Sequence, residues 1–225
     1  MSALEVVGPD EWKTAHAELL AAEKAHTRAT DALAARRRRA PMMAMGKGHV
    51  FAAPGGEVGL SDLFEGRRQL ILYSFMLPDA GSEPCGGCSF FTDQVGHLAH
   101  LHQRDTTLAL IAPAPIATIQ ALQARMGWGD IPFYSTAGNT AFYEELGIGS
   151  GFALNVFLQE GDRILRTYTV SGRGTEKLGS TWTFLDLTPM GRQETWEDAP
   201  DWVEQTPPYE WWRLHDEYAS AGARA

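Results

Sequence analysis

The stretch LILYSFMLPDAGSEPCGGCSFF, residues 70–91, decides the fold of this 225-residue chain. Its first six residues form an apolar run, which is typical of a central strand covered on both faces. The stretch then holds the only two cysteines of the sequence, Cys85 and Cys88, with two glycines between them. A helix is predicted to follow over residues 88–103. The sequence therefore places a CxxC motif where a buried strand ends and a helix begins.

The rest of the chain up to Pro189 alternates between predicted helices and strands. Strands are predicted at residues 107–112, 131–136, 153–158 and 164–170, and a helix at 116–128. A short helix is capped by Asn139 and ended by Gly147, and a last helix is capped by Thr175, with Leu178, Trp182 and Leu185 facing inward. This order predicts an α/β domain with a mixed sheet over residues 42–190.

Residues 1–41 are predicted to form a helical arm. Pro9 and the acids after it suit a helix start, and the run of arginines before Pro41 suits a helix end. A thin, alanine-rich apolar seam follows one face: Trp12, Ala15, Leu19, Ala22, His26, Ala29 and Leu33. Such a long helix is poorly buried by one domain, so we expect a homodimer in which the arm packs across a partner chain. The alternative is an arm folded back on its own core.

The tail, residues 191–225, is rich in tryptophan, proline and acidic residues. It is too apolar for a disordered segment, so we expect it to pack on the domain or on a partner. The net charge of −9 argues against nucleic acid as a partner. No apolar run reaches the roughly 18 residues of a membrane span, and no basic segment followed by an apolar run opens the sequence. These features predict a cytoplasmic protein.

Three interpretations of the cysteine pair are open at this point. The pair is a dithiol that cycles through a disulfide, half of a zinc site, or two small buried residues without chemistry. Binding sites in open α/β sheets collect at the carboxyl ends of strands, which favours the dithiol. Cys85 would lie at the helix start, where a thiol pKa falls from about 8.5 to as low as roughly 3.5–7.5. Cys88, one turn further in, would be the shielded resolving thiol.

A metal site has less support. Zinc bound by the two cysteines needs two more ligands, and the sequence has no second CxxC. His97 and His100 share a predicted helix face with Asp93 and Arg104, but that face lies opposite the apolar one and is expected to be solvated. We therefore predict no metal and no other cofactor.

The chain resembles the thioredoxin-like superfamily and, more closely, the DUF899 family, whose members are described as predicted dithiol-disulfide oxidoreductases. The resemblance covers nearly the whole chain, in ATDALAARRRRAPM, LSDLFEGRRQLILYSFM, CGGCSFFTD, RMGW, TYTVSGRGTE, FLDLTPMGR and HDEY. It implies a thioredoxin-like mixed β-sheet flanked by helices, with a long N-terminal helix and a Trp-rich C-terminal tail. It also implies that Cys85 is the nucleophile and Cys88 the resolving cysteine, and that the partner is a protein or small-molecule disulfide or thiol.

The motif departs from the thioredoxin pattern. Pro84 stands where thioredoxins have tryptophan, and Gly86-Gly87 replaces Gly-Pro. The preceding strand carries no buried acid, and residues 149–157 lack the proline expected before the final hairpin. Glu83, close to Cys85, opposes thiolate formation.

A peroxiredoxin-like interpretation rests on the spacing of Pro78, Ser82 and Cys85. Peroxiredoxins also need an arginine where this chain has Leu154, and Arg173 in SGRG is the candidate substitute. The sequence favours thiol–disulfide exchange over peroxide reduction, and a non-enzymatic interaction module is the third alternative. Arg173 and Ser82 are the candidate anion or substrate contacts.

Overall fold

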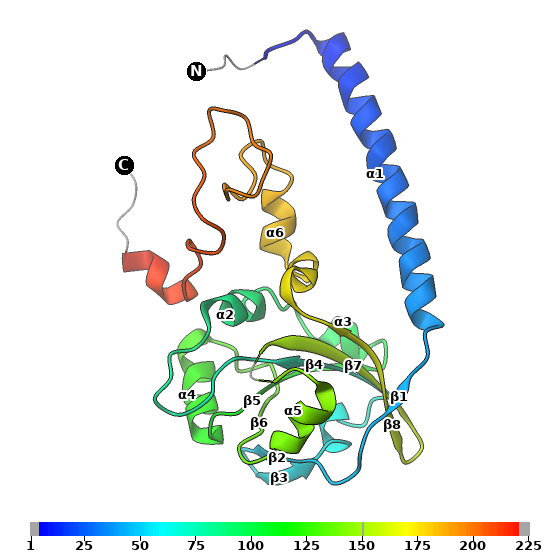
Figure 1. Ribbon diagram of the computed structural model, residues 1–225, viewed down its shortest axis with the longest axis vertical. Helices are drawn as coiled ribbons and strands as arrows, with labels where there is room; N and C mark the ends of the chain where they lie inside the picture. The colour runs from blue at the N-terminus through cyan, green and yellow to red at the C-terminus, as the bar shows by residue number, and fades with distance from the viewer. Residues whose placement is uncertain (1–4, 150, 221–225) are drawn as a thin grey trace.

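The computed structural model describes residues 5–149 and 151–220 (Figure 1). The described strands form one eight-stranded mixed sheet, in the order β1-β8-β7-β4-β5-β6-β2-β3. The strands are β1 Met43–Ala44, β2 Val50–Ala53, β3 Gly56–Gly59, β4 Gln69–Ser74, β5 Thr106–Ala112, β6 Phe133–Ser135, β7 Ala153–Glu160 and β8 Arg163–Val170. The α-helices are α1 Pro9–Arg38, α2 Gly86–Thr92, α3 Ala99–His102, α4 Ile116–Met126, α5 Thr140–Leu146 and α6 Ser180–Leu185, and the 3₁₀ helices are η1 Asp62–Phe64, η2 Gly172–Leu178 and η3 His215–Ser220.

The central strands have the thioredoxin-like arrangement. β4 pairs in parallel with β5 and antiparallel with β7, and β7 and β8 form an antiparallel hairpin. A strand–helix–strand unit joined through β7 to a terminal hairpin is therefore the centre of the sheet. The predicted fold class is confirmed. Residues 1–4 of the predicted arm and 221–225 of the predicted tail lie outside the described residues.

Strand β4 is covered on both faces, as its apolar sequence predicts. Leu70 and Leu72 are fully buried in one hydrophobic cluster together with Phe142 of α5. The alternate residue Tyr73 faces the other cluster, where its ring stacks on Phe91 of α2 at 4.3 Å between centroids. The period of two along a strand therefore directs Tyr73 toward the helix that follows the cysteine motif.

The predicted helix over residues 88–103 is wrong as one element, because the chain leaves the helix after Thr92. The N–H groups of Gln94 and Val95 donate to carbonyls three residues earlier, which tightens the last turn. The carboxylate of Asp93 accepts the indole N–H of Trp128 at 2.8 Å, which turns this residue toward α4. A separate helix, α3, resumes at Ala99.

The predicted last helix is also divided, into η2 and α6. Gly179 between them is extended, and a Cβ atom there would lie 2.2 Å from the ring of Trp182. Thr175 does not cap α6, because it lies inside η2 and its hydroxyl donates to the carbonyl of Gly172 at 2.9 Å. Trp182 is buried as predicted, but Leu178 is 47% exposed.

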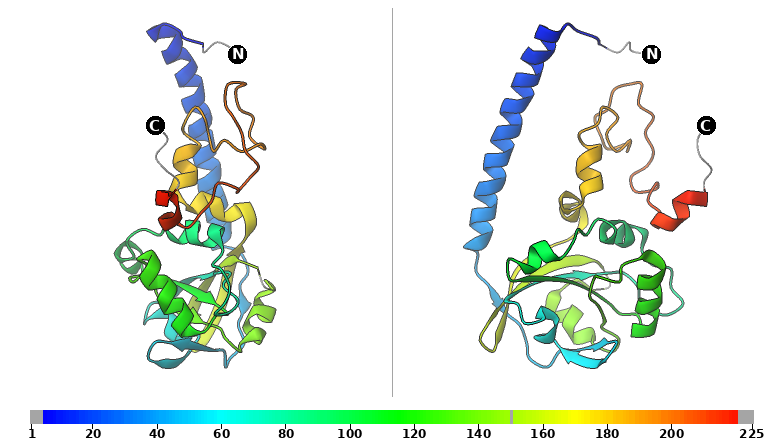
Figure 2. Two further views of the ribbon diagram at one scale, coloured as in Figure 1. Left: turned by 90° about the vertical axis from the view of Figure 1, so that its left-hand side faces the viewer. Right: turned by 180° about the vertical axis from the view of Figure 1, so that it is seen from behind.

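The tail packs on the α2 side of the domain (Figure 2). Leu214 is 4% exposed and belongs to the same hydrophobic cluster as α2 and α4. The ring of Trp212 stacks on Phe90 of α2, with 5.4 Å between centroids and 7° between planes. The tail thus contacts the domain of its own chain. The boundaries drawn at residues 41 and 190 stay a prediction.

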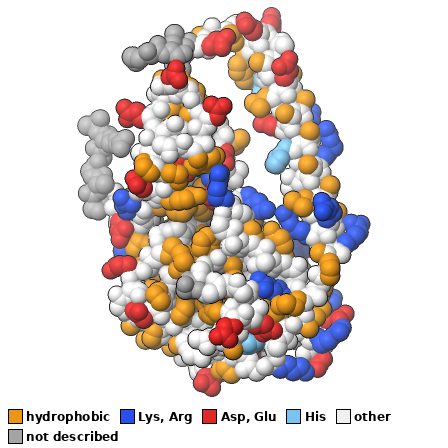
Figure 3. Space-filling view, in the orientation of Figure 1, with side chains coloured by type: hydrophobic (Ala, Val, Ile, Leu, Met, Phe, Trp, Pro, Cys, Tyr) orange, Lys and Arg blue, Asp and Glu red, His pale blue; other side chains and the backbone are white. Residues whose placement is uncertain are grey.

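Helix α1 extends away from the domain instead of folding back on the core (Figures 1 and 3). Its apolar seam is open to solvent, since Trp12 and Leu19 are each 57% exposed and Leu33 is 43% exposed. Contact with the sheet occurs at its C-terminal end, where the guanidinium of Arg37 lies 5.1 Å from the ring centroid of Tyr168. Among the described helices, none combines the length and apolarity needed to cross a bilayer.

We propose that the seam of α1 forms part of a homodimer interface. Light scattering should then give about twice the chain mass of 24.7 kDa. Leu19→Glu, which places a charge in the seam, should shift the mass to that of one chain. Ala17→Glu adds the same charge on the opposite face of the helix and should leave the dimer intact. A single-chain mass for the unaltered protein would contradict the proposal.

Candidate active site

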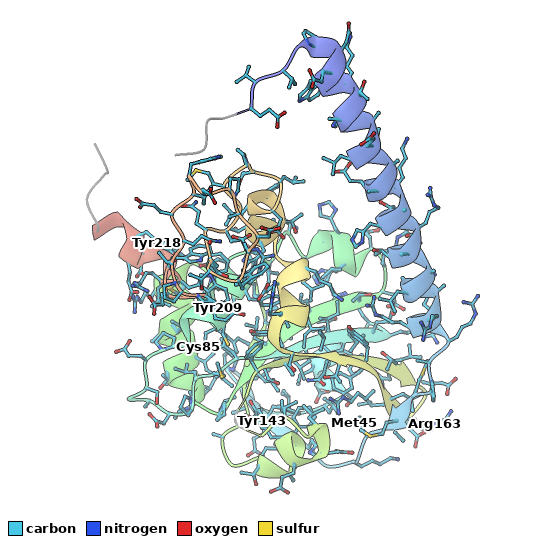
Figure 4. All side chains as sticks on the ribbon, turned by 45° about the horizontal axis from the view of Figure 1, so that its top comes forward. Met45, Cys85, Tyr143, Arg163, Tyr209 and Tyr218 are labelled. Carbon is cyan, nitrogen blue, oxygen red and sulfur yellow. The ribbon has the colours of Figure 1, made fainter. Side chains whose placement is uncertain are left out.

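The two cysteines open into a pocket of about 490 Å³ between α2, η2 and the tail. Cys85, Cys88 and Arg173 all line it, so three of the four site residues proposed from the sequence lie around one cavity. Half of the remaining lining residues are aromatic: Tyr73, Phe91, Phe152, Trp182, Tyr209 and Trp212. Figure 4 shows Cys85 close to Tyr209, which lines the same pocket.

Cys85 is the N-cap residue of α2, and its sulfur accepts a backbone hydrogen bond. The N–H of Cys88 lies 3.3 Å from Sγ of Cys85. Its pKa is lowered to about 6, first by the hydrogen bond from the Cys88 side chain and then by the backbone N–H groups of Cys88 and Gly87, against the opposing effect of burial. These donors stabilise the thiolate more than partial burial disfavours it. Cys85 is therefore ionised near neutral pH.

Cys88 has the opposite electrostatic environment. Its side chain is 1% exposed, and its pKa is raised by the hydrogen bond that it gives to Cys85 and by burial. Tyr73 also hydrogen-bonds to Cys88, and burial together with the nearby sulfurs raises the pKa of this tyrosine well above its usual value. The site thus pairs a thiolate at Cys85 with a buried protonated thiol and a protonated phenol behind it.

Arg173 contributes a cation to the pocket wall from η2. Its guanidinium carbon lies 3.8 Å from the ring centroid of Trp196, and its side chain is 53% exposed. Its Nε atom is 3.5 Å from a carboxylate oxygen of Glu176, and that same oxygen lies only 2.5 Å from Nη1 of the buried Arg192. Glu176 is therefore mainly the partner of Arg192, which leaves Arg173 facing solvent at the mouth of the pocket.

Trp212 explains why the motif is CGGC instead of CGPC. A Cβ atom on Gly87 would lie 2.9 Å from Cζ3 of Trp212, closer than atoms pack in folded proteins. Only glycine at position 87 lets the indole ring lie directly on the first turn of α2. Gly87, which stands where thioredoxins have proline, thus makes room for Trp212, a tail residue 125 positions further along the chain.

Ser82 lies apart from this arrangement. Its hydroxyl donates to the carboxylate of Asp79 at 2.9 Å in the loop after β4, and it is not part of the pocket wall. In the described part of the chain, no three histidine, cysteine or acidic side chains converge on a possible metal position. His97 and His100 lie with their ring centroids 6.3 Å apart.

Tyr73, Glu176 and Trp212 are among the pocket residues that sequence reasoning missed. Tyr73 carried a usable signal, because it is the one phenol in an aliphatic strand and has the strand phase that faces α2. Glu176 and Trp212 carried none, since only the folded chain brings η2 and the tail to the cysteine motif.

Comparison with known proteins gives a family and several similar solved structures. The structure of the reduced 2-Cys peroxiredoxin of Plasmodium vivax is similar over 59% of this chain and 82% of its own chain, with 18% sequence identity and a TM-score of 0.40. No curated protein matches the sequence. Residues 1–218 match the family described as "Bacterial protein of unknown function (DUF899)". The chain therefore belongs to the DUF899 family.

Proposed function

We propose that this protein is a thiol–disulfide oxidoreductase in which Cys85 is the nucleophile and Cys88 the resolving cysteine. The observation that carries the proposal is the asymmetry of the pair. The Cys85 thiolate is stabilised at the edge of a pocket, with a pKa of about 6, whereas Cys88 is buried and protonated one turn behind it. An accessible thiolate beside a shielded thiol is what two-step exchange requires.

The reaction proceeds by two displacements. The Cys85 thiolate attacks one sulfur of a substrate disulfide, forms a mixed disulfide and releases the first substrate thiolate, which takes a proton from water. Cys88 then loses its proton and attacks Sγ of Cys85, which releases the second substrate thiol. The substrate gains two electrons and two protons, and the protein is left with a Cys85–Cys88 disulfide. A cellular thiol or dithiol reductant, as expected in a cytoplasmic setting, returns it to the dithiol.

Two further residues have roles in this scheme. Tyr73 is kept protonated by burial and hydrogen-bonds to Cys88, so it stabilises the Cys88 thiolate while the second displacement takes place. Arg173, half exposed on the pocket wall, is the contact for an anionic group of the substrate. Ser82 has no part in it, because its hydroxyl is directed to Asp79.

Peroxide reduction at Cys85 is the second candidate. The observation in its favour is that Arg173 lines the same pocket as the thiolate, where a cation can orient a peroxide. The thiolate would attack one peroxide oxygen to give a sulfenic acid and hydroxide, and Cys88 would then displace water to form the same disulfide.

The intact mass of the purified protein tests the proposal. We expect a low-molecular-weight disulfide to remove two hydrogens from the reduced protein, and dithiothreitol to restore them. Loss of two hydrogens with hydrogen peroxide at a higher rate than with any disulfide would favour the peroxidase. Two thiols that stay reduced under both treatments would contradict both enzymatic proposals and leave the interaction module.

A further inference from the structure

A segment of the tail, residues 209–217, lies across the cysteine motif, and we call it the cover segment. Trp212 rests on Gly87 and stacks on Phe90 of α2. Tyr209 lies beside Trp212 with 4.6 Å between ring centroids, and both line the pocket that Cys85 opens into. The face of α2 through which the thiolate would meet a partner is thus occupied by the protein's own chain.

The cover segment is attached at both ends. At its start, the buried carboxylate of Glu194 accepts the backbone N–H of Tyr209 at 3.0 Å and the indole N–H of Trp211 at 2.8 Å. At its end, Asp216 binds Arg125 of α4 through two hydrogen bonds of 2.7 and 3.0 Å. Because its start binds a buried carboxylate near the beginning of the tail and its end binds α4 of the domain, the segment is part of the pocket wall.

The pocket beneath the cover segment has the size and lining of a small-molecule site. Its volume of about 490 Å³ lies within the roughly 300–1,000 Å³ of typical ligand pockets. The aromatic side chains that line it come from β4, α2, the residue before β7, α6 and the tail, so flat apolar groups can be contacted from several sides. A cysteine on a protein surface would have to reach Cys85 past Trp212 and Tyr209, which line the same pocket.

We infer that the substrate of this site is a low-molecular-weight disulfide with an aromatic body, and that protein disulfides are excluded by the cover segment. This inference rests on the proposed function, because it names the disulfide that Cys85 attacks. The aromatic group would lie between the rings of the pocket and bring one disulfide sulfur to the thiolate. The displacement itself, and its balance of electrons and protons, are those given above.

Single-turnover kinetics of the reduced protein tests the inference. The probes are 4,4′-dithiodipyridine as the small aromatic disulfide, bis(2-hydroxyethyl) disulfide as the small aliphatic one, and insulin as the protein disulfide. Each rate constant is divided by that of mercaptoethanol with the same probe, which removes differences in leaving group. We expect the normalised rate for the aromatic probe to exceed that for insulin by at least about tenfold, the size of one or two aromatic contacts.

Two variants test whether the cover segment causes the preference for the aromatic probe over insulin. Trp212→Ala removes the ring, and Gly87→Ala keeps the backbone N–H but pushes the ring away with its added methyl group. Both should lower the ratio of aromatic to insulin rates about tenfold. The exposed Arg163→Ala, on the β7–β8 hairpin far from Cys85 (Figure 4), should leave the ratio unchanged. Gly87→Ala keeps the test valid if Trp212→Ala fails to fold.

The outcomes separate this inference from the proposed function. A protein that reduces insulin as fast as the aromatic probe, or a ratio that neither variant moves, overturns the inference and leaves disulfide exchange in place. Equal rates for the aromatic and aliphatic probes would overturn the aromatic preference. If no probe reacts faster with the protein than with mercaptoethanol at any pH, the proposed function itself fails.

Discussion

Replacing Cys85 with serine is expected to abolish every reaction of this protein with disulfides, whereas Cys88→Ser should leave a thiol that is trapped as a stable mixed disulfide. The reason is the order of the two displacements. Without Cys85 the remaining thiol, Cys88, is buried and shielded from a disulfide, and without Cys88 the first adduct has nothing to resolve it. Intact mass after mixing with a small aromatic disulfide should show one half of the probe on Cys88→Ser and none on Cys85→Ser.

The pH dependence is a sharper test than the rate at neutral pH. With a pKa of about 6, the reactivity of Cys85 should be level above pH 7 and fall tenfold for each pH unit well below 6. Compared with an unperturbed thiol, ionisation gives about 30-fold more thiolate at pH 7, but lower nucleophilicity reduces the net gain to about twofold. At pH 5 the same reasoning gives a net gain of about 20-fold.

Two matched variants distinguish the hydrogen-bond donors that lower the pKa of Cys85. The largest is the hydrogen bond from the Cys88 side chain. Serine at position 88 keeps a donor at this point and alanine does not, so the apparent pKa of Cys85 should be higher in Cys88→Ala than in Cys88→Ser. Identical pH profiles in the two variants would show that the backbone N–H groups alone set the pKa. A profile centred near pH 8.5 in Cys88→Ser would contradict the assignment of Cys85 as the stabilised thiolate.

The fold was largely predictable because its central elements carry strong local patterns. The aliphatic run of β4 and the alternation of strands and helices around it allow few other arrangements. The boundaries that failed were decided by distant contacts. The helix after the motif ends where Asp93 turns toward Trp128, and the last helix divides where Gly179 makes room for Trp182. Neither contact leaves a periodic signal in the sequence.

The sequence predicted three residues that meet around one pocket, but not the shape of that pocket. Cys85 and Cys88 form a CxxC at a strand end, and Arg173 is a cation between two glycines, so all three could be singled out from the sequence. The cover segment has no such signature, since Trp212 reads as one more aromatic residue of the tail. The residue on which Trp212 packs is unusual in the sequence, because Gly87 stands where thioredoxins have proline. That glycine becomes meaningful once the ring lying on it is known.

Arg192→Met is expected to release the tail from the domain. The Arg192 side chain is 7% exposed and donates to Asp186 at 2.6 and 2.7 Å and to Glu176 at 2.5 Å. Burial disfavours its charge, but the two carboxylates outweigh burial and raise its pKa. Removing it leaves Glu176 buried beside the more distant Arg173, and breaking a buried pair in this way costs about 3–5 kcal/mol. For a chain of this length the midpoint of thermal unfolding should fall by about 10 °C.

Two controls test whether the loss of stability in Arg192→Met comes from the unpaired buried charge. Arg163→Met breaks the exposed pair with Glu160 and should cost less than about 1 kcal/mol. The double variant Arg192→Met with Glu176→Gln removes both charges, so it should be more stable than Arg192→Met alone. If the double variant is no more stable, the cost lies in lost packing and not in the unpaired carboxylate.

Arg192→Met also connects the stability of the fold to the candidate active site. Arg192 holds the start of the tail, and Glu194 in that part of the tail anchors the cover segment. Loosening that anchor should raise the rate of Cys85 with insulin, while the pKa of Cys85 should stay near 6, since its donors lie within α2. A fall in stability with unchanged reactivity toward insulin would show that the cover segment stays in place without Arg192. A pKa that rose as well would show that the tail contributes to the thiolate itself, and not only to access.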